Sequence, residues 1–249
     1  MDVDEPVNLT NCDREPIHIP GSIQEHGCLL ACDTQVSLIL RHSANASAIL
    51  DLRGEINGSA LENLLGGEIA HTLRNALATS SSEGRAALLF DLDINGRTFD
   101  VAIHRFQSTV IIEFEPSATR FNHPLDLTRA LIGRLSRTTD ADRLVRETAR
   151  LVRGLLGYDR VMVYRFERDG SGKVVSEAKR SDLESFLGQY FPASDIPQQA
   201  RVLYLRNIIR IIGDADSRQI PLEPALDASG EPLDLSFAHL RSVSPIHLE

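Results

Sequence analysis

The sequence predicts an α+β protein of two domains, each an antiparallel sheet with flanking helices. Its 249 residues exceed the typical domain length of about 100–200 residues. Short alternating runs bounded by turn residues favour antiparallel strands, and segments with helical spacing lie between them. A polar stretch with two prolines, residues 115–124, separates the halves. Hydrophobic residues make up 42% of the chain, which is enough for two cores.

Composition excludes several classes of partner. The net charge of -9 and a pI near 5.4 argue against nucleic acid and anionic membranes, because both require basic surfaces. No run of eighteen apolar residues occurs, and the acidic N-terminus lacks a signal peptide's apolar region, so we expect a cytoplasmic protein. Cys12, Cys28 and Cys32 are odd in number, which favours reduced thiols over a disulfide scaffold.

Residues 1–27 are expected to form an extended arm, because they contain three prolines and little periodicity. Within this arm, Cys12 has polar neighbours and is predicted to be accessible to chemistry. The alternative, an unreactive cysteine in a tail, is favoured by composition alone.

Residues 28–118 are expected to form the first domain, of PAS type, with an antiparallel sheet and short helices. Asn95-Gly96 suits a type I′ turn between two strands. After this turn, apolar residues alternate with Asp100, Ala102 and His104, so one face is expected in the core and the other in contact with water. The expected strands are 28–33, 36–41, two within 86–106, and 108–115, and the expected helices are 44–50 and 68–79.

Residues 124–249 are expected to form the second domain, of GAF type. Two helices, 127–135 and 144–156, precede two strands, and Gly157 is the expected C-cap of the second helix. These helices could pair between subunits to make a homodimer, although packing on their own sheet is the commoner outcome. The expected strands are a central one at 161–166 and its neighbour at 173–178, joined by a turn at 169–172.

The loop before the next helix is predicted to be stiff. Pro192 and Pro197 fix their own φ angles and favour extended geometry at Phe191 and Ile196. A stiff loop can orient the carboxylate of Asp195. The alternative, equally favoured by spacing, is a capping box of Asp195 and Gln198 that opens a helix through about residue 207.

Two arginines in apolar surroundings are candidate anion ligands. If residues 207–212 form a strand, Arg210 lies between two isoleucines, where an unpaired charge is costly. An edge position with the guanidinium in water is the alternative. Arg241 has a similar setting beside Leu240. His247 follows Ser244-Pro245, and a lone histidine of this kind is more often an ordinary structural residue.

Three sequence runs together resemble the bacteriophytochromes, which are bilin-binding red and far-red photoreceptors. They are DREPIHIPGSIQ at 13–24, PASDIP at 192–197 and RSVSPIH at 241–247, in the order of that family. The resemblance covers the whole chain but not a complete GAF domain, because the sequence stops at Glu249. It implies an arm knotted through a GAF loop near Ile23. One departure is Glu25, where the family usually has proline.

The resemblance also implies a cofactor and its ligands. Cys12 matches the cysteine that forms a thioether to biliverdin, and Arg210 and Arg241 match arginines that pair with the bilin propionates. The Asp195 backbone carbonyl and His247 match groups bonded to the pyrroles and the pyrrole water. The implied function is light sensing by photoisomerisation of the pigment. The other implied pocket residues are Tyr164, Phe191, Ile196, Tyr204 and Ser244.

Three other functions compete with this one. A metal or redox switch could use the cysteines with His18 and His26, but no C-x-x-C pair occurs and Cys28 and Cys32 lie in an apolar strand. A GAF domain could instead bind a cyclic nucleotide. An enzyme is not expected, since the chain has no Gly-rich ATP loop, although full-length relatives are commonly sensor histidine kinases.

The end of the sequence carries a further expectation. Relatives continue through more GAF strands and downstream PHY and histidine kinase modules. If this polypeptide stops at Glu249, an open sheet edge and a pocket missing one wall should weaken pigment binding and promote association. If the chain continues, binding should be tight.

Overall fold

The computed structural model describes residues 14–80, 84–117, 124–196, 198–207 and 209–244. Contacts divide the chain into two compact units. The first unit combines residues 1–118 with 198–249, and the second comprises residues 119–197. The range 124–249, expected as one domain, therefore contributes to both units.

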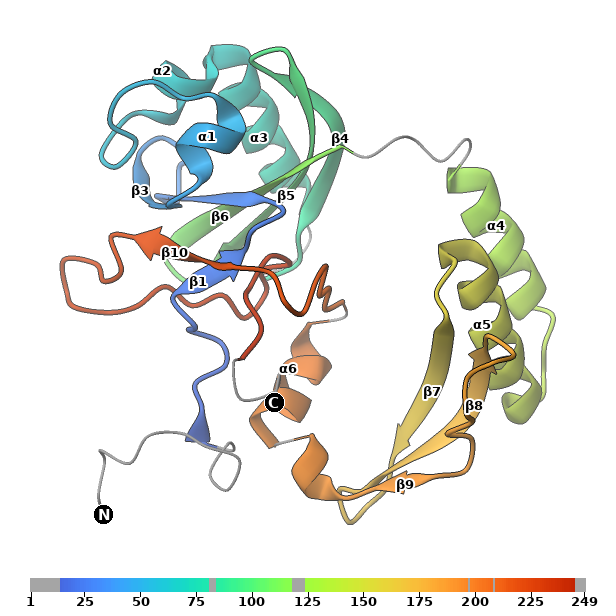
Figure 1. The fold of residues 1–249 in the computed structure, drawn as a ribbon. Coiled ribbons are helices and arrows are strands. Elements are labelled where there is room, and N and C mark those ends of the chain that lie inside the picture. Colours follow the sequence, from blue (N-terminus) through green and yellow to red (C-terminus); the bar gives the residue numbers. More distant parts are fainter. Residues whose placement is uncertain (1–13, 81–83, 118–123, 197, 208, 245–249) are drawn as a thin grey trace, which may run out of the picture. The chain divides into compact units, whose positions relative to one another are not determined.

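The first unit contains a seven-stranded antiparallel sheet in the order β1-β10-β3-β2-β6-β5-β4 (Figure 1). The strands are β1 (Ser22–Gln24), β2 (Cys28–Cys32), β3 (Ile39–Ser43), β4 (Ala87–Ile94), β5 (Arg97–Phe106), β6 (Thr109–Pro116) and β10 (Gln219–Glu223). Helices α1 (Ala46–Leu50), α2 (Leu61–Leu65) and α3 (Gly67–Thr79) lie on one face of this sheet (Figure 1).

The main core lies between these helices and the sheet. Leu50 and Leu73 from the helices are fully buried in one cluster with Phe99 and Phe114 from the strands. The two phenyl rings meet edge to face with their centroids 6.5 Å apart. This is the mixed α+β architecture that the alternating strands predicted, with α3 starting one residue before its expected position.

The opposite face of the sheet is also covered, which corrects the expectation of a wetter face. His104 is fully buried and Ala102 is nearly so. A second apolar cluster covers this face, because Leu235 and Leu240 from the C-terminal segment pack with Leu29 of β2 and its neighbours. The alternation in the sequence correctly separated the two faces, but the segment that covers the second face is more than 120 residues away in sequence.

Local residues predicted the turn of one hairpin in the first unit correctly but not the loop length of another. Asn95 and Gly96 both have positive φ angles, 53° and 77°, as a type I′ turn requires, so this prediction is confirmed. The earlier hairpin is wider than expected, because β3 begins at Ile39 rather than at Val36. The Asp33 Oδ1 atom accepts a 2.7 Å hydrogen bond from the Ser37 N–H and holds the longer loop.

The N-terminal arm joins the sheet through β1. Ile23 is fully buried, pairs with Ile220 of β10 and forms a bridge with Arg241. The arm therefore lies between two segments from the far end of the chain. Glu25, at the family's proline position, approaches Arg218 at 3.9 Å, but both side chains are exposed and the pair contributes little stability.

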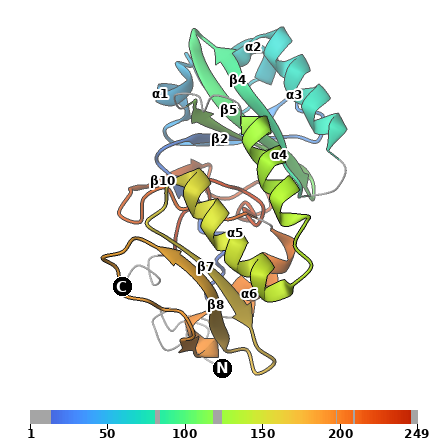
Figure 2. The same ribbon diagram turned by 90° about the vertical axis from the view of Figure 1, so that its right-hand side faces the viewer.

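The second unit contains an antiparallel sheet in the order β7-β8-β9. Figure 2 shows α4 (Pro124–Leu135) beside α5 (Ala141–Leu156), and α5 packs against this sheet. The predicted C-cap of α5 is confirmed, since Gly157 has a φ of 71° and its N–H bonds to the Arg153 carbonyl at 2.9 Å. The strands are β7 (Arg160–Phe166), β8 (Gly172–Lys179) and β9 (Tyr190–Phe191).

One strand position in this unit was wrong. The run 161–166 was expected in the centre of its sheet, but β8 is central among the described strands and β7 lies beside it. Apolar residues on both faces of a strand indicate burial above and below it, and they do not specify neighbours on both edges.

Two expectations near α6 (Gln198–Arg206) were also wrong. Asp195 is not the N-cap, because it belongs to the 3-10 helix η2 (Ala193–Asp195), three residues before α6 begins. The described residues within 207–212 form no strand, since side chains satisfy their backbone groups. Gln24 bonds to the Ile211 carbonyl at 3.0 Å and accepts from the Gly213 N–H at 2.8 Å.

Candidate functional site

A pocket of about 160 Å³ lies in the first unit. Four of the predicted site residues line it, namely Tyr204, Arg210, Arg241 and Ser244. Tyr204 comes from α6, whereas the other three belong to irregular segments beyond it. The sequence did not identify two apolar wall residues, Ile17 from the arm and Leu203 from α6.

Arg210 is held at this pocket by backbone carbonyls. Its Nη1 atom donates to the carbonyls of Ile211 at 2.9 Å and His239 at 3.3 Å. Its Nη2 atom donates to the Ser242 carbonyl at 3.1 Å. These bonds orient the guanidinium without neutralising its charge.

Arg241 is buried more deeply, with 7% of its surface exposed. Its Nη1 atom donates to the Ile17 carbonyl at 2.9 Å, and its buried Nε atom has no hydrogen-bond partner among the described residues. A buried guanidinium donor without a partner is uncommon, because its desolvation is then uncompensated. The Nε atom marks a position where an acceptor would be stabilised.

The electrostatics of both arginines favour an anion in this pocket. Burial, with the nearby charge of Arg241 as a lesser cause, lowers the pKa of Arg210 to about 10. Burial also lowers the pKa of Arg241. Within the described part of the chain, neither arginine forms an ion pair with a carboxylate. Two desolvated, like charges without a counter-ion are costly, and an entering carboxylate would compensate both.

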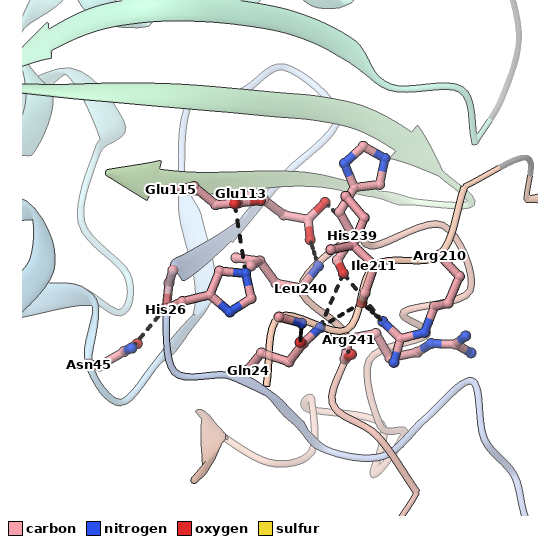
Figure 3. Close-up of polar contacts among 12 residues, drawn as sticks. Gln24, His26, Asn45, Glu113, Glu115, Arg210, Ile211, His239, Leu240 and Arg241 are labelled. Atoms are coloured by element: carbon pink, nitrogen blue, oxygen red, sulfur yellow. Dashed lines mark hydrogen bonds and ion pairs between the residues drawn. The ribbon is translucent and has the colours of Figure 1, made fainter. Parts of the chain in front are cut away.

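Gln24 fixes the backbone beneath this pocket (Figure 3). Its Nε2 atom donates to the carbonyls of Ile211 at 3.0 Å and Arg241 at 3.2 Å, and its backbone N–H donates to Leu240. Only 2% of Gln24 is exposed. The sequence placed Gln24 in a family-like run, but no local pattern indicated that its amide joins two distant segments, 211–213 and 239–241.

The second unit brings together a different group of predicted residues. The rings of Tyr164 and Phe191 lie 6.1 Å apart, and Phe166 and Phe186 extend this aromatic group. Phe191 and Tyr164 are partly buried. Figure 1 places both on the β7-β8-β9 sheet through their strands. The structure therefore brings these rings together, and their role in the pocket stays a prediction.

The stiff loop around Asp195 has the expected backbone geometry. Pro192 has a φ of -65°, and Ile196 is extended with φ -128° and ψ 93°. Asp195 is exposed, and its Oδ1 atom accepts a weak 3.4 Å hydrogen bond from Ser194. The Asp195 carboxylate is therefore exposed to solvent and does not cap α6. Cys12 and His247 lie outside the described residues.

The two other cysteines are poor candidates for metal or redox chemistry. Cys28 and Cys32 are fully buried in β2. Burial raises the pKa of the Cys32 thiol to about 12, and it raises that of Cys28 further, so neither forms a thiolate readily. Across the described ranges, no cluster of three histidine, cysteine or acidic residues could hold a metal ion. The metal or redox alternative is therefore not favoured.

No helix within the described ranges has the length and apolar character needed to span a bilayer.

Comparisons with known proteins agree on one family. A family profile described as PAS fold matches residues 12–117. The chain is 38% identical to a bacteriophytochrome of Pseudomonas aeruginosa and 39% identical to cyanobacterial phytochrome B of a Nostoc species, over 98% of its length in both cases. It spans 34% and 33% of these two relatives, or about one third of each.

A solved structure extends the similarity to the fold. The chromophore-binding domain of the Stigmatella aurantiaca bacteriophytochrome is 40% identical, with a TM-score of 0.82. The match covers 96% of this chain and 80% of that one.

Proposed function

This chain belongs to the phytochrome family, and on that premise we propose that it forms the pigment-binding part of a red and far-red light receptor. The observation that carries this proposal is the pair of a half-buried Arg210 and a buried Arg241, two cations without an acidic partner among the described residues. We propose that the pigment is biliverdin, a linear tetrapyrrole with two propionate groups.

The pocket suits the propionate groups of such a pigment. A drug-sized ligand usually occupies about 300–1,000 Å³, whereas this pocket measures about 160 Å³. It can therefore hold the carboxylate arms but not the conjugated system. The unpartnered Nε atom of Arg241 supplies a donor for a carboxylate oxygen. Arg210, which lines the same pocket, supplies the second charge.

The remaining predicted residues have roles in this proposal that follow from the family resemblance. Cys12 would attach the pigment through a thioether, which requires an accessible thiol. The Asp195 carbonyl and His247 would bond to the pyrrole groups. When bound, the pigment supplies the light-absorbing double bond that isomerises. Tyr164, Phe191, Ile196, Tyr204 and Ser244 would restrain its rings.

We also propose the knot that the resemblance implies. Ile23 pairs with Ile220 and bridges to Arg241, and Gln24 contacts residues 211–213, so the arm is bordered by segments on several sides. A knot of this kind would prevent the arm, and Cys12 with it, from separating from the pocket. The light-dependent change would pass to PHY and histidine kinase modules, and the receptor would act as a homodimer.

The experiment that tests this function is a pigment titration. Purified protein is mixed with biliverdin, and the visible spectrum is recorded before and after red illumination. We expect a red-shifted band that forms stoichiometrically and changes reversibly with light. A protein that leaves the biliverdin spectrum unchanged, but is stabilised by a cyclic nucleotide, would favour the alternative GAF function.

A further inference from the structure

Glu113 is a buried carboxylate on β6 that contacts a distant turn. Only 1% of the residue is exposed. Its Oε1 atom accepts a 2.7 Å hydrogen bond from the Leu240 N–H, and its Oε2 atom accepts a 3.1 Å bond from the His239 N–H. No cation within the described ranges lies at ion-pair distance from it. The carboxylate thus fixes the N–H groups of this turn.

The carbonyl groups of the same backbone are held from other directions. Arg210 donates to the His239 and Ser242 carbonyls, and Gln24 donates to the Leu240 and Arg241 carbonyls. Figure 3 shows these groups together around the backbone from His239 to Arg241. The segment 239–242 is therefore held by hydrogen bonds at every residue, and Glu113 supplies the two bonds that come from β6.

An aromatic contact anchors the same segment just upstream. The Phe237 ring lies 4.9 Å from the Phe106 ring and 6.3 Å from the His104 ring, both on β5. This contact fixes where the segment meets the sheet. Glu113 then fixes the direction of the backbone that leads to Arg241.

A carboxylate is a costly way to hold two N–H groups inside a protein. Burial raises the pKa of Glu113 to about 7, although the bonds from Leu240 and His239 oppose that rise. A neutral side chain could support the fold without a buried charge. The negative charge of Glu113 can instead interact with the two arginines of the neighbouring pocket. Arg210 stabilises the ionised form of Glu113.

We propose that Glu113 is a positioning residue for pigment binding: by holding the backbone at His239 and Leu240, it keeps the Arg210 and Arg241 guanidinium groups oriented toward one dicarboxylate ligand. This inference rests on the proposed function, and it assigns to a PAS-sheet residue a role in recognising the pigment's carboxylates. Glu113 itself does not touch the pigment.

The test compares biliverdin with its dimethyl ester, which lacks the two negative charges. The ratio of their affinities measures how well the arginines recognise carboxylates. For the parent we expect biliverdin to bind at least about tenfold more tightly than the ester, as expected for charge-assisted hydrogen bonds. In Glu113→Gln this preference should fall by about fivefold or more, because one amide group cannot accept from both N–H groups.

Glu115→Gln is the matched control. Glu115 lies two residues along the same strand, and its Oε2 atom is 3.7 Å from the His26 Nε2 atom. It does not bond to the 239–242 backbone. The control should keep the parent's preference, so that loss of a negative charge from β6 is separated from loss of the Glu113 hydrogen bonds.

The outcomes separate failure of the proposed pigment-binding function from failure of the positioning role of Glu113. If the parent binds neither pigment, the proposed function is refuted and this inference falls with it. If the parent prefers biliverdin and a folded Glu113→Gln variant keeps that preference in full, the positioning role is refuted. Should Glu113→Gln not fold by circular dichroism, Glu113→Asp is used, because its shorter carboxylate keeps the charge but cannot reach both N–H groups. An unchanged preference in that variant would equally overturn the inference.

Discussion

The buried carboxylate of Glu113 makes the stability of the protein depend on pH in a direction that the structure specifies. Its pKa is raised from 4.5 to about 7, with burial as the largest cause. Between these values the folded protein keeps a proton that the unfolded chain has released. Stability from this group is therefore complete below about pH 4.5 and falls as pH rises toward about 7.

The magnitude follows from the size of the pKa shift. One pKa unit corresponds to about 1.4 kcal/mol, so Glu113 should destabilise the fold by about 2 to 3 kcal/mol on going from about pH 5 to about pH 8. In Glu113→Gln this contribution disappears. The variant loses one backbone hydrogen bond and should be about 1–3 kcal/mol less stable than the parent at low pH. At about pH 8 the two proteins should have nearly equal stability.

The measurement is urea unfolding of pigment-free parent and variant, followed by circular dichroism at several pH values. The quantity compared is the difference between their free energies of unfolding, in which titrations common to both proteins cancel. Glu115→Gln serves again as the control: because Glu115 is only a lesser cause of the raised Glu113 pKa, this variant should keep most of the parent's pH dependence. If the parent and Glu113→Gln curves run parallel across this range, Glu113 is ionised throughout and the electrostatic reasoning fails.

Three further predictions concern the pigment. Cys12→Ser should retain pigment but lose covalent attachment, so its band in zinc-enhanced fluorescence of a denaturing gel should vanish; a band as bright as the parent's would move attachment to another cysteine. Asp195→Ala should bind pigment but photoconvert poorly and fluoresce more, whereas normal photoconversion would leave Asp195 a purely structural role. Arg241→Lys should weaken biliverdin binding about tenfold in a titration, because lysine keeps the charge but loses the Nε donor; unchanged affinity would exclude Arg241 as a carboxylate ligand.

Local patterns predicted the long elements of this fold well and the short ones poorly. The hairpin at Asn95-Gly96 and the C-cap of α5 are specified by residues within a few positions of each other. Strands β1 and β10 have only three and five residues, and they pair across nearly 200 positions of sequence. No period can be read from so few residues, and β10 contains Pro221, which argues against a strand.

In the candidate site too, the sequence predicted residues with a local signal and missed those that act over long sequence distances. The sequence identified Arg210 and Arg241, because a guanidinium in an apolar run is unusual and both match a family pattern. It did not identify Gln24 or Glu113, since both act on backbone groups more than 100 residues away. In the strand 109–116, Glu113 occupies the alternate position typical of a solvated face, and only the folded chain reveals that the face is covered. Side chains that bond to distant backbone leave no local signal.

His104 lies on the same covered face, and its titration should change the stability with pH in the opposite direction to that of Glu113. Its ring is fully buried, neither nitrogen has a hydrogen-bond partner, and burial lowers its pKa to about 4, with His239 as a lesser cause. Below about pH 6.5 the unfolded chain binds a proton that the folded ring does not, so stability from this group is lost as pH falls, by about 2 kcal/mol at about pH 5.

The two groups therefore nearly cancel in the parent, whose stability should change little between about pH 5 and about pH 8. Replacing either residue should leave the pH dependence of the other one visible in the stability of the variant. His104→Leu removes an unsatisfied polar ring and should become more stable on acidification, because Glu113 then acts alone. Glu113→Gln should become less stable under the same change. Slopes of the same sign in the two variants would refute the assignment of these opposite titrations to His104 and Glu113.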